Sequence, residues 1–307
     1  MDFISGEIID ILPNRNDGTT QEYFLSISQE ERDRVRFIIC DMYNSYINFT
    51  ARYFKNSCAV IDSFHVVQWL NKRIVQYINQ VKKRYQERDN RLLEENNHDT
   101  NKDNKSMKVS NEVYLLNNYR WVLLMNKDNI HYSTFRRYNR KLRMHLDTYD
   151  LEKAFLALDD NFPKIRDLRE KYITFNNSNE SDFSVLSNEL DILINIFSES
   201  DQFIFKDFSS LLNKYKKEII HSFTKITDHS LSQKNADLIR RLSNGPIKGF
   251  NRKPKDLKRN SRGVTNFLYT RNRILWATRE NAPILAIPKN REDVSTHTDI
   301  KRGTYKK

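Results

Sequence analysis

Residues 35–62 read VRFIICDMYNSYINFTARYFKNSCAVID, and this stretch contains two apolar runs that each stop at an acid. The first run ends at Asp41 and the second at Asp62, and the residues from Tyr43 to Phe54 between them predict a helix. Strand, helix and strand at this spacing predict a buried pair of parallel strands. Because ligand chemistry in such sheets collects at the carboxyl ends of strands, Asp41 and Asp62 are candidate functional residues.

Outside this unit the chain predicts one further strand and then a series of helices. Residues 6–12 predict a short strand that ends at a turn, and residues 19–28 predict a short helix. From Phe64 onward one long helix is predicted from an apolar stripe: Val67, Leu70, Ile74, Ile78, Val81 and Tyr85. More helices are predicted at 109–125, 131–147, 149–158, 162–174, 182–198 and 205–223, with a loop at 96–106.

The composition agrees with a long helical chain that has a basic C-terminal part. Six Gly and six Pro in 307 residues are too few for a turn-rich all-β design. The net charge is +12, and between Arg240 and Arg279 twelve Lys/Arg face a single acid, Asp256. Such a block is typical of proteins that bind a polyanion, usually nucleic acid and less often an anionic membrane.

The cysteines and the hydropathy pattern exclude several other classes of protein. Cys40 and Cys58 have no partner at zinc-ligand spacing, so we expect buried thiols rather than a disulfide or a metal site. No stretch approaches the roughly 20 apolar residues that a membrane span needs, and no signal peptide opens the chain. The sequence therefore predicts a cytoplasmic protein. It contains no glycine-rich phosphate loop after a strand and no G-x-S-x-G motif.

The basic block itself predicts a helix with a charged face. Pro246 suits the first turn of a helix that we expect to end at Gly263, with a last helix at 265–278. One face carries Lys248, Arg252, Lys255, Arg259 and Arg262; Lys253 and Lys258 flank it, and Arg271, Arg273 and Arg279 extend it. Pro254 should bend this helix. A solvated basic face is the alternative, but a stripe with almost no acids favours bound DNA.

Three segments together resemble one family, the bacterial insertion-sequence DDE transposases of the ISL-three type. They are ICDMY at 39–43 with Tyr46, IDSFHVV at 61–67 with Leu70-Asn71, and SNGPIKGFN at 243–251. The third segment continues through Lys255, Lys258, Gly263 and Asn266 to Arg273. The order and spacing of the segments match as well, so the resemblance extends to about Pro288.

The resemblance implies phosphoryl transfer on double-stranded DNA at transposon ends, by an RNase H-like domain that a helical insertion interrupts. In that chemistry three carboxylates hold two Mg²⁺ ions. Asp41 matches the second catalytic acid and a metal ligand, and Asp62 matches a neighbouring acid that supports the site. The implied division is 1–75 for the first part of the core, 76–235 for the insertion, 236–285 for the final core helices and 286–307 for a disordered tail.

Two departures from the family pattern predict a catalytically inactive chain. The family's first acid lies on a strand upstream of residue 1, so we expect an N-terminal truncation. Lys248 stands where the pattern has its catalytic glutamate, although an acid is favoured in the first turn of a helix. A cation cannot ligate Mg²⁺. Either the Lys248 ammonium points toward Asp41 and replaces the charge of a metal, or it is a solvated side chain.

Two other functions remain open from the sequence. The chain could be a non-enzymatic DNA-binding remnant that inhibits an intact transposase, as a homodimer or as a heterodimer with that relative. It could instead be a general RNA-binding protein in which the strand-end acids are incidental. Competition between duplex DNA and structured RNA at one salt concentration separates this second possibility from the others.

Overall fold

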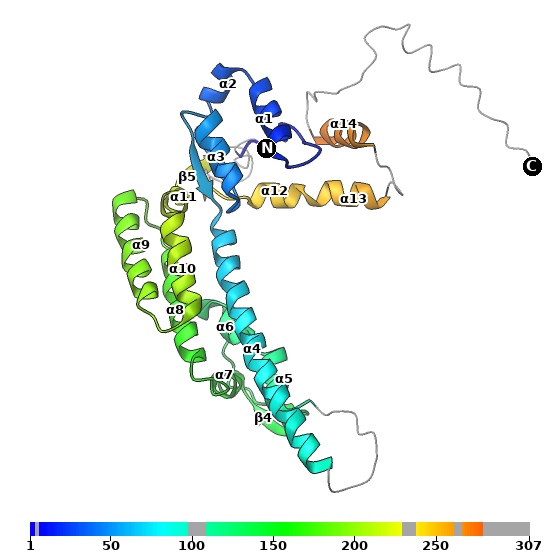
Figure 1. The fold of residues 1–307 in the computed structure, drawn as a ribbon, viewed down its shortest axis with the longest axis vertical. Helices are drawn as coiled ribbons and strands as arrows, with labels where there is room; N and C mark the ends of the chain where they lie inside the picture. Colours follow the sequence, from blue (N-terminus) through cyan, green and yellow to red (C-terminus); the bar gives the residue numbers. More distant parts are fainter. Residues whose placement is uncertain (4–5, 98–108, 229–237, 261–265, 279–307) are drawn as a thin grey trace, which may run out of the picture.

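A two-stranded parallel sheet lies at one end of the molecule in the computed structural model (Figure 1). β1 (Phe37–Cys40) pairs with β2 (Cys58–Ile61) so that Phe37 lies opposite Cys58 and Cys40 opposite Ile61. α3 (Asn44–Tyr53) connects the strands, and α1 (Asp17–Ser26) and α2 (Gln29–Asp33) precede them. The predicted strand–helix–strand unit with a parallel pair is confirmed. The structure describes residues 1–3, 6–97, 109–228, 238–260 and 266–278.

The long helix predicted after the second strand is α4 (Ser63–Asn97). Its inward stripe is at most 1% exposed and comprises Val66, Leu70, Ile74, Ile78 and Val81. A helix of 35 residues is about 52 Å long at the usual rise per residue. α4 therefore runs from the sheet to the opposite end of the molecule (Figure 1).

The other helices surround one continuous core. They are α5 (Asn111–Asn118), α6 (Trp121–Leu124), η1 (Lys127–Asn129), α7 (Thr148–Leu156), α8 (Phe162–Asn176), α9 (Phe183–Ser198), α10 (Phe203–Lys214) and α11 (Lys216–His221). Of these, α5, α6, α8 and α10 contact α4 directly. The observed helices confirm the predicted helices except the one at 131–147, although two of the predicted helices are each broken in two. The chain is predominantly helical, as predicted.

A hairpin replaces the helix predicted at 131–147. β3 (Arg137–Asn139) pairs antiparallel with β4 (Met144–Leu146). The Asn139 side chain accepts hydrogen bonds from the backbone N–H groups of Lys141 and Leu142, at 3.0 and 3.1 Å, and so closes the turn. Its amide donates to the hydroxyls of Tyr114 and Tyr119. These bonds replace the backbone bonds that a helix would need, so the helical expectation was wrong here.

The strand predicted at 6–12 is also absent from the described residues, where this segment is irregular. It is fixed instead by a side chain, because Asp10 accepts a bond of 2.7 Å from Arg271 of α14 (Phe267–Thr278). A short apolar run before a turn predicted a strand, but among the described residues no neighbouring strand offers this segment a ladder of backbone hydrogen bonds.

The chain returns from the helical part to the sheet through an antiparallel pair, β5 (Lys225–Asp228) and β6 (Leu238–Arg241). α12 (Gly245–Phe250) and α13 (Arg252–Asn260) follow and project from the sheet end (Figure 1). The predicted boundary at residue 75 falls inside α4, and the division into domains stays a prediction. The expectations for the loop at 96–106 (from residue 98 on), for Gly263, for Arg279 and for the tail at 286–307 lie outside the described residues.

One hydrogen-bond network fixes α4 against the helices beside it. The Tyr77 hydroxyl donates to Asp159 at 2.9 Å and accepts from the Asn161 amide at 2.8 Å. Gln202 donates to Asn161 in turn, at 2.8 Å. The network therefore joins three segments that are far apart in the sequence, around Tyr77, Asn161 and Gln202.

Tyr77→Phe should lower the free energy of unfolding by about 1–2 kcal/mol, because Asp159 and Asn161 both lose a partner in a partly buried place. Chemical denaturation measures the loss. Tyr269→Phe, on α14, provides a control for removing the hydroxyl of an exposed tyrosine. Equal stability of Tyr77→Phe and the wild type would show that the network does not hold the helices together.

Within the described residues no helix combines the length and the apolar character that crossing a membrane requires.

Candidate functional site at the strand ends

The two strand-end acids lie side by side because their strands are parallel and in register. Asp41 follows β1 and Asp62 follows β2 directly after the paired ends Cys40 and Ile61. The backbone N–H of Asp62 donates to the carbonyl of Cys40 at 3.3 Å, which extends the ladder to the acids themselves. The prediction that both acids stand at one edge of the sheet is confirmed.

Asp62 is 2% exposed and is held by three donors. Its Oδ1 accepts from the backbone N–H of Phe64 at 3.1 Å, in the first turn of α4. Its Oδ2 accepts from the backbone N–H of Asn244 and from the Nζ of Lys248, each at 3.2 Å. A single carboxylate therefore caps α4 and fastens a segment about 180 residues further along the chain to the sheet.

Lys248 reaches this carboxylate from the first turn of α12. Its backbone N–H donates to the carbonyl of Asn244 at 3.0 Å, and Pro246 lies in the same turn. The ammonium contacts Asp62 and lies 3.3 Å from the centroid of the Phe64 ring, a cation–π arrangement. The side chain is 39% exposed, so solvent screens this ion pair only in part.

The structure corrects the expected partner of Lys248. The ammonium bonds to Asp62, and no bond joins it to Asp41 within the described residues. The ammonium binds Asp62 rather than Asp41 because the Oδ2 of Asp62 faces the turn that opens α12. The second possibility, a solvated lysine, holds only in part: the side chain is 39% exposed, but its ammonium is engaged by Asp62 and by the Phe64 ring. Asp41, Asp62 and Lys248 are nevertheless brought together, as the sequence predicted.

Asp41 lies at a cavity of about 540 Å³ between the sheet and α12. His65, Asn244 and Lys248 line the same cavity. The Oδ1 of Asp41 is buried and has no hydrogen-bond partner within the described residues. Burial and then the charge of Asp41 raise the pKa of the Cys40 thiol to about 12. Asp41 therefore lies at the cavity with one carboxylate oxygen that is buried and unsatisfied by any described residue.

The carboxylates around this cavity do not fit a divalent metal. Mg²⁺ takes six oxygen ligands in an octahedron and is usually bound through one or two carboxylates. Asp62 has both oxygens engaged and a lysine ammonium at 3.2 Å, which would repel a second cation. Asp41 alone offers an oxygen, and the described residues contain no group of three or more His, Cys, Asp or Glu that could hold a metal.

The basic face predicted after Pro246 is largely present on α13. Arg252, Lys253, Lys255 and Arg259 are exposed, while Asp256 lies at 3.6–3.8 Å from two of the arginines. Exposed pairs at that distance contribute little, so the face stays positive. The helix is interrupted at Asn251, where the ring of Pro254 would clash with the carbonyl three to four residues earlier. Lys258 lies in α13 without a described side chain, and Arg262 lies outside the described residues.

Three cations of the basic block are engaged by other parts of the protein. Arg271 is 4% exposed and bonds to Asp10, so the expectation that it faces DNA is wrong. Arg241 donates to the Ser222 carbonyl and lies 3.6 Å above the Phe223 ring, and burial lowers its pKa. Lys248 is bound to Asp62. Arg273 is exposed on α14 and stays in the predicted set.

A second basic surface was missed by the sequence reasoning. The hairpin of β3 and β4 and the residues before it, 135–146, contain five Lys/Arg and no acid. The signal was visible in the sequence, but on the helix expected at 131–147 these cations would have been an ordinary solvated face.

The comparisons with known proteins agree with the resemblance. The family model that matches the chain is described as a transposase, of the DDE ISL-three type, and it matches residues 1–274. No curated protein and no solved structure matches the chain. The match covers most of the 307 residues, including both strand-end acids and α12. The chain therefore belongs to the DDE transposase family of the ISL-three type.

Proposed function

We propose that this chain is a member of the transposase family that binds double-stranded DNA and does not itself cleave or join strands. The observation that carries the proposal is the ion pair between Lys248 and Asp62, at 3.2 Å, in the position where the resemblance places a catalytic glutamate. In this proposal the strands and the C-terminal helices form the RNase H-like part, and the helices between them form the insertion.

Transposases of this family use divalent metal ions held by carboxylates, and the Mg²⁺ ions would supply an activated attacking oxygen and a stabilised leaving oxygen. In this chain Asp41 would be the remaining metal ligand. A lysine that neutralises the second acid removes both a ligand and the negative charge that attracts the metal. We therefore derive no catalytic step for this site.

The DNA-binding part of the proposal rests on α13 and its neighbour. The cations proposed to contact DNA are Arg252, Lys253, Lys255, Lys258, Arg259 and Arg273. Contacts from such residues go to phosphates, so they position the duplex and carry little sequence information. A chain that occupies transposon ends without cutting them would compete with an intact relative, or would pair with it.

Salt dependence tests the DNA-binding proposal. If the six cations contact phosphates, the logarithm of the association constant should fall with the logarithm of salt concentration, with a slope of about −5. Fluorescence anisotropy with a labelled duplex of about 30 base pairs measures this slope between roughly 0.05 and 0.3 M salt. A slope near zero contradicts the proposal, and a stronger preference for structured RNA at one salt concentration replaces it with RNA binding.

A further inference from the structure

The hairpin of β3 and β4 is a polar ribbon at the opposite end of α4 from the sheet. Figure 1 places β4 beside α5 and α7, near the far end of α4. Asn139 fastens the ribbon to the hydroxyls of Tyr114 and Tyr119, at 3.3 and 2.9 Å. Lys82 of α4 donates to Asn117, and Arg88 of α4 donates to Glu112 of α5. Because the hairpin is bonded to tyrosines of the same segment, it lies beside residues 82–88 of α4.

Most of the arginines of the hairpin are exposed and have no acid beside them in the part of the chain that the structure describes. Arg136 is neutralised by Asp150 at 2.9 Å and by Asp147 at 3.7 Å. Arg137, Arg140 and Arg143 are exposed, and none of them has an ion-pair partner among the residues that the structure describes. Three unpaired arginines within seven residues repel one another unless an anion lies against them.

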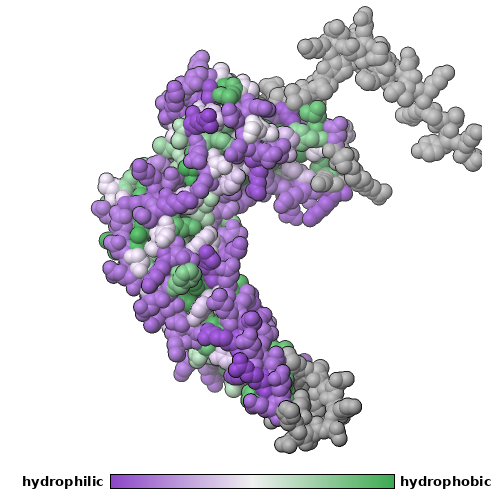
Figure 2. Space-filling model, viewed as in Figure 1, coloured by the Kyte–Doolittle hydropathy of each residue, from purple (hydrophilic) through white to green (hydrophobic). Residues whose placement is uncertain are grey.

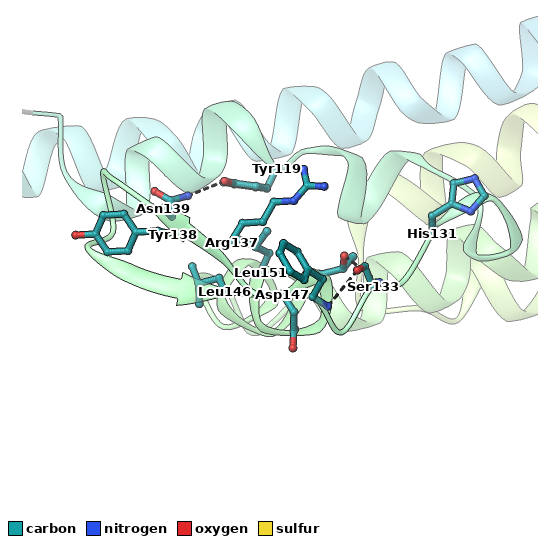
Figure 3. Close-up of a pocket in the computed structure, with 11 residues that line it drawn as sticks. Tyr119, His131, Ser133, Arg137, Tyr138, Asn139, Leu146, Asp147 and Leu151 are labelled. Carbon is teal, nitrogen blue, oxygen red and sulfur yellow. Dashed lines mark hydrogen bonds between the residues drawn. The ribbon is translucent and has the colours of Figure 1, made fainter.

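Aromatic side chains are interleaved with these arginines. Phe135 is 69% exposed and Tyr138 is 55% exposed, and the Arg137 guanidinium carbon lies 5.9 Å from the Phe135 ring. Tyr138 pairs across the strands with His145, with ring centroids 5.2 Å apart. Arg137 also lines a cavity of about 400 Å³ beside α7, together with Tyr119 and Asp147 (Figure 3). Aromatic side chains among cations also occur on surfaces that bind nucleic acid.

We propose that the β3–β4 hairpin is a second DNA-contact surface, which contacts the same duplex at a site separate from α13. The proposal rests on the proposed function, because α13 provides the first contact. A two-stranded ribbon is narrow enough to enter the major groove of a duplex. The duplex is chosen over RNA because both basic surfaces belong to one transposase-family chain.

α4 separates the two surfaces. α12 begins next to the start of α4, whereas the hairpin lies at the level of residues 82–88, about 20–25 residues along the helix. At the usual rise these two points are about 30–38 Å apart along α4. α13 follows α12 and projects away from α4 (Figure 1), so a duplex of about one turn is too short to contact both surfaces. Figure 2 shows a molecule that is hollowed on one side between its two ends.

The test compares duplexes of different length with a hairpin variant. The variant combines Arg137→Gln, Arg140→Gln and Arg143→Asn; Asn is chosen because Arg143 has a φ of 57°, which Asn tolerates. For a duplex of about 30 base pairs it should bind at least about 10-fold more weakly, with a salt slope about 2–3 less negative. For a duplex of about 10 base pairs, which cannot reach both surfaces, affinity should change by less than about 2-fold.

The control variant changes three exposed cations elsewhere, Lys72→Gln, Lys83→Gln and Lys171→Gln, and should bind both duplexes like the wild type. Thermal unfolding of each variant confirms that it is folded. Unchanged affinity of the hairpin variant for the long duplex overturns the proposal while leaving DNA binding by α13 intact. Loss of structured-RNA binding alone also overturns it. Failure of the wild type to bind any duplex overturns the proposed function itself.

Discussion

Replacing Arg252, Lys255 and Arg259 with glutamate should weaken binding of a duplex of about 30 base pairs by more than about 100-fold at 0.1 M salt. These residues lie three and four positions apart on one face of α13, and all three are exposed. Reversal removes three phosphate contacts and adds three charges that repel the backbone. The α-helix itself tolerates glutamate well, so the fold should be kept.

The measurement is the same anisotropy titration, with circular dichroism as the check on helical content. The variant carrying Lys72→Glu, Lys83→Glu and Lys171→Glu has the same change in net charge and should lose much less affinity. If both triple variants lose affinity equally, the affinity for DNA depends on the net charge of the protein and not on α13. The assignment of the DNA-binding face would then be wrong.

Lys248→Glu should destabilise the protein by about 2–3 kcal/mol in the absence of divalent ions. The substitution removes the ammonium from the buried Asp62 carboxylate and places a second carboxylate near it. With Asp41 in the adjoining cavity, three carboxylates would then face one another, an arrangement that favours a bound cation. Added Mn²⁺ or Mg²⁺ should therefore recover part of the lost stability of this variant.

Thermal unfolding with and without divalent ions measures both effects. Lys248→Met provides the control, because it removes the positive charge without adding a ligand; it should be destabilised and gain nothing from metal. The wild type should also be indifferent to Mg²⁺. Full stability of Lys248→Glu without metal would show that the ion pair does not hold α12 on the sheet.

The sequence contained most of the information that places the site. Apolar runs that stop at Asp41 and Asp62 predicted a parallel pair, since strands covered on both faces read as continuous apolar runs; in the structure only the last residues of the two strands are fully buried. The stripe from Val67 to Tyr85 predicted α4 for the related reason that one helix face must be buried, although the structure buries Val66 rather than Val67. The family resemblance then placed the Pro246 helix beside the strand ends, which no local pattern could have done.

The parts that were not predictable depend on contacts between distant side chains. Asp10 and Arg271 form an ion pair across 261 residues, and only the folded chain shows that Arg271 is taken out of the basic face. Lys248 had two carboxylates within reach, and the backbone N–H of Asn244 decides which one faces it. The hairpin at 137–146 depends on the side-chain bonds of Asn139 to two tyrosines of the α5 region, which periodicity does not report.

The most direct test of the central claim is a nicking assay on supercoiled plasmid DNA with the purified chain and Mg²⁺ or Mn²⁺. The ion pair of Lys248 with Asp62 predicts DNA binding without nicking, and the same absence of nicking for Asp41→Ala. Nicking by the wild-type chain that disappears in Asp41→Ala would show that the strand-end acids still catalyse phosphoryl transfer, and would contradict the account.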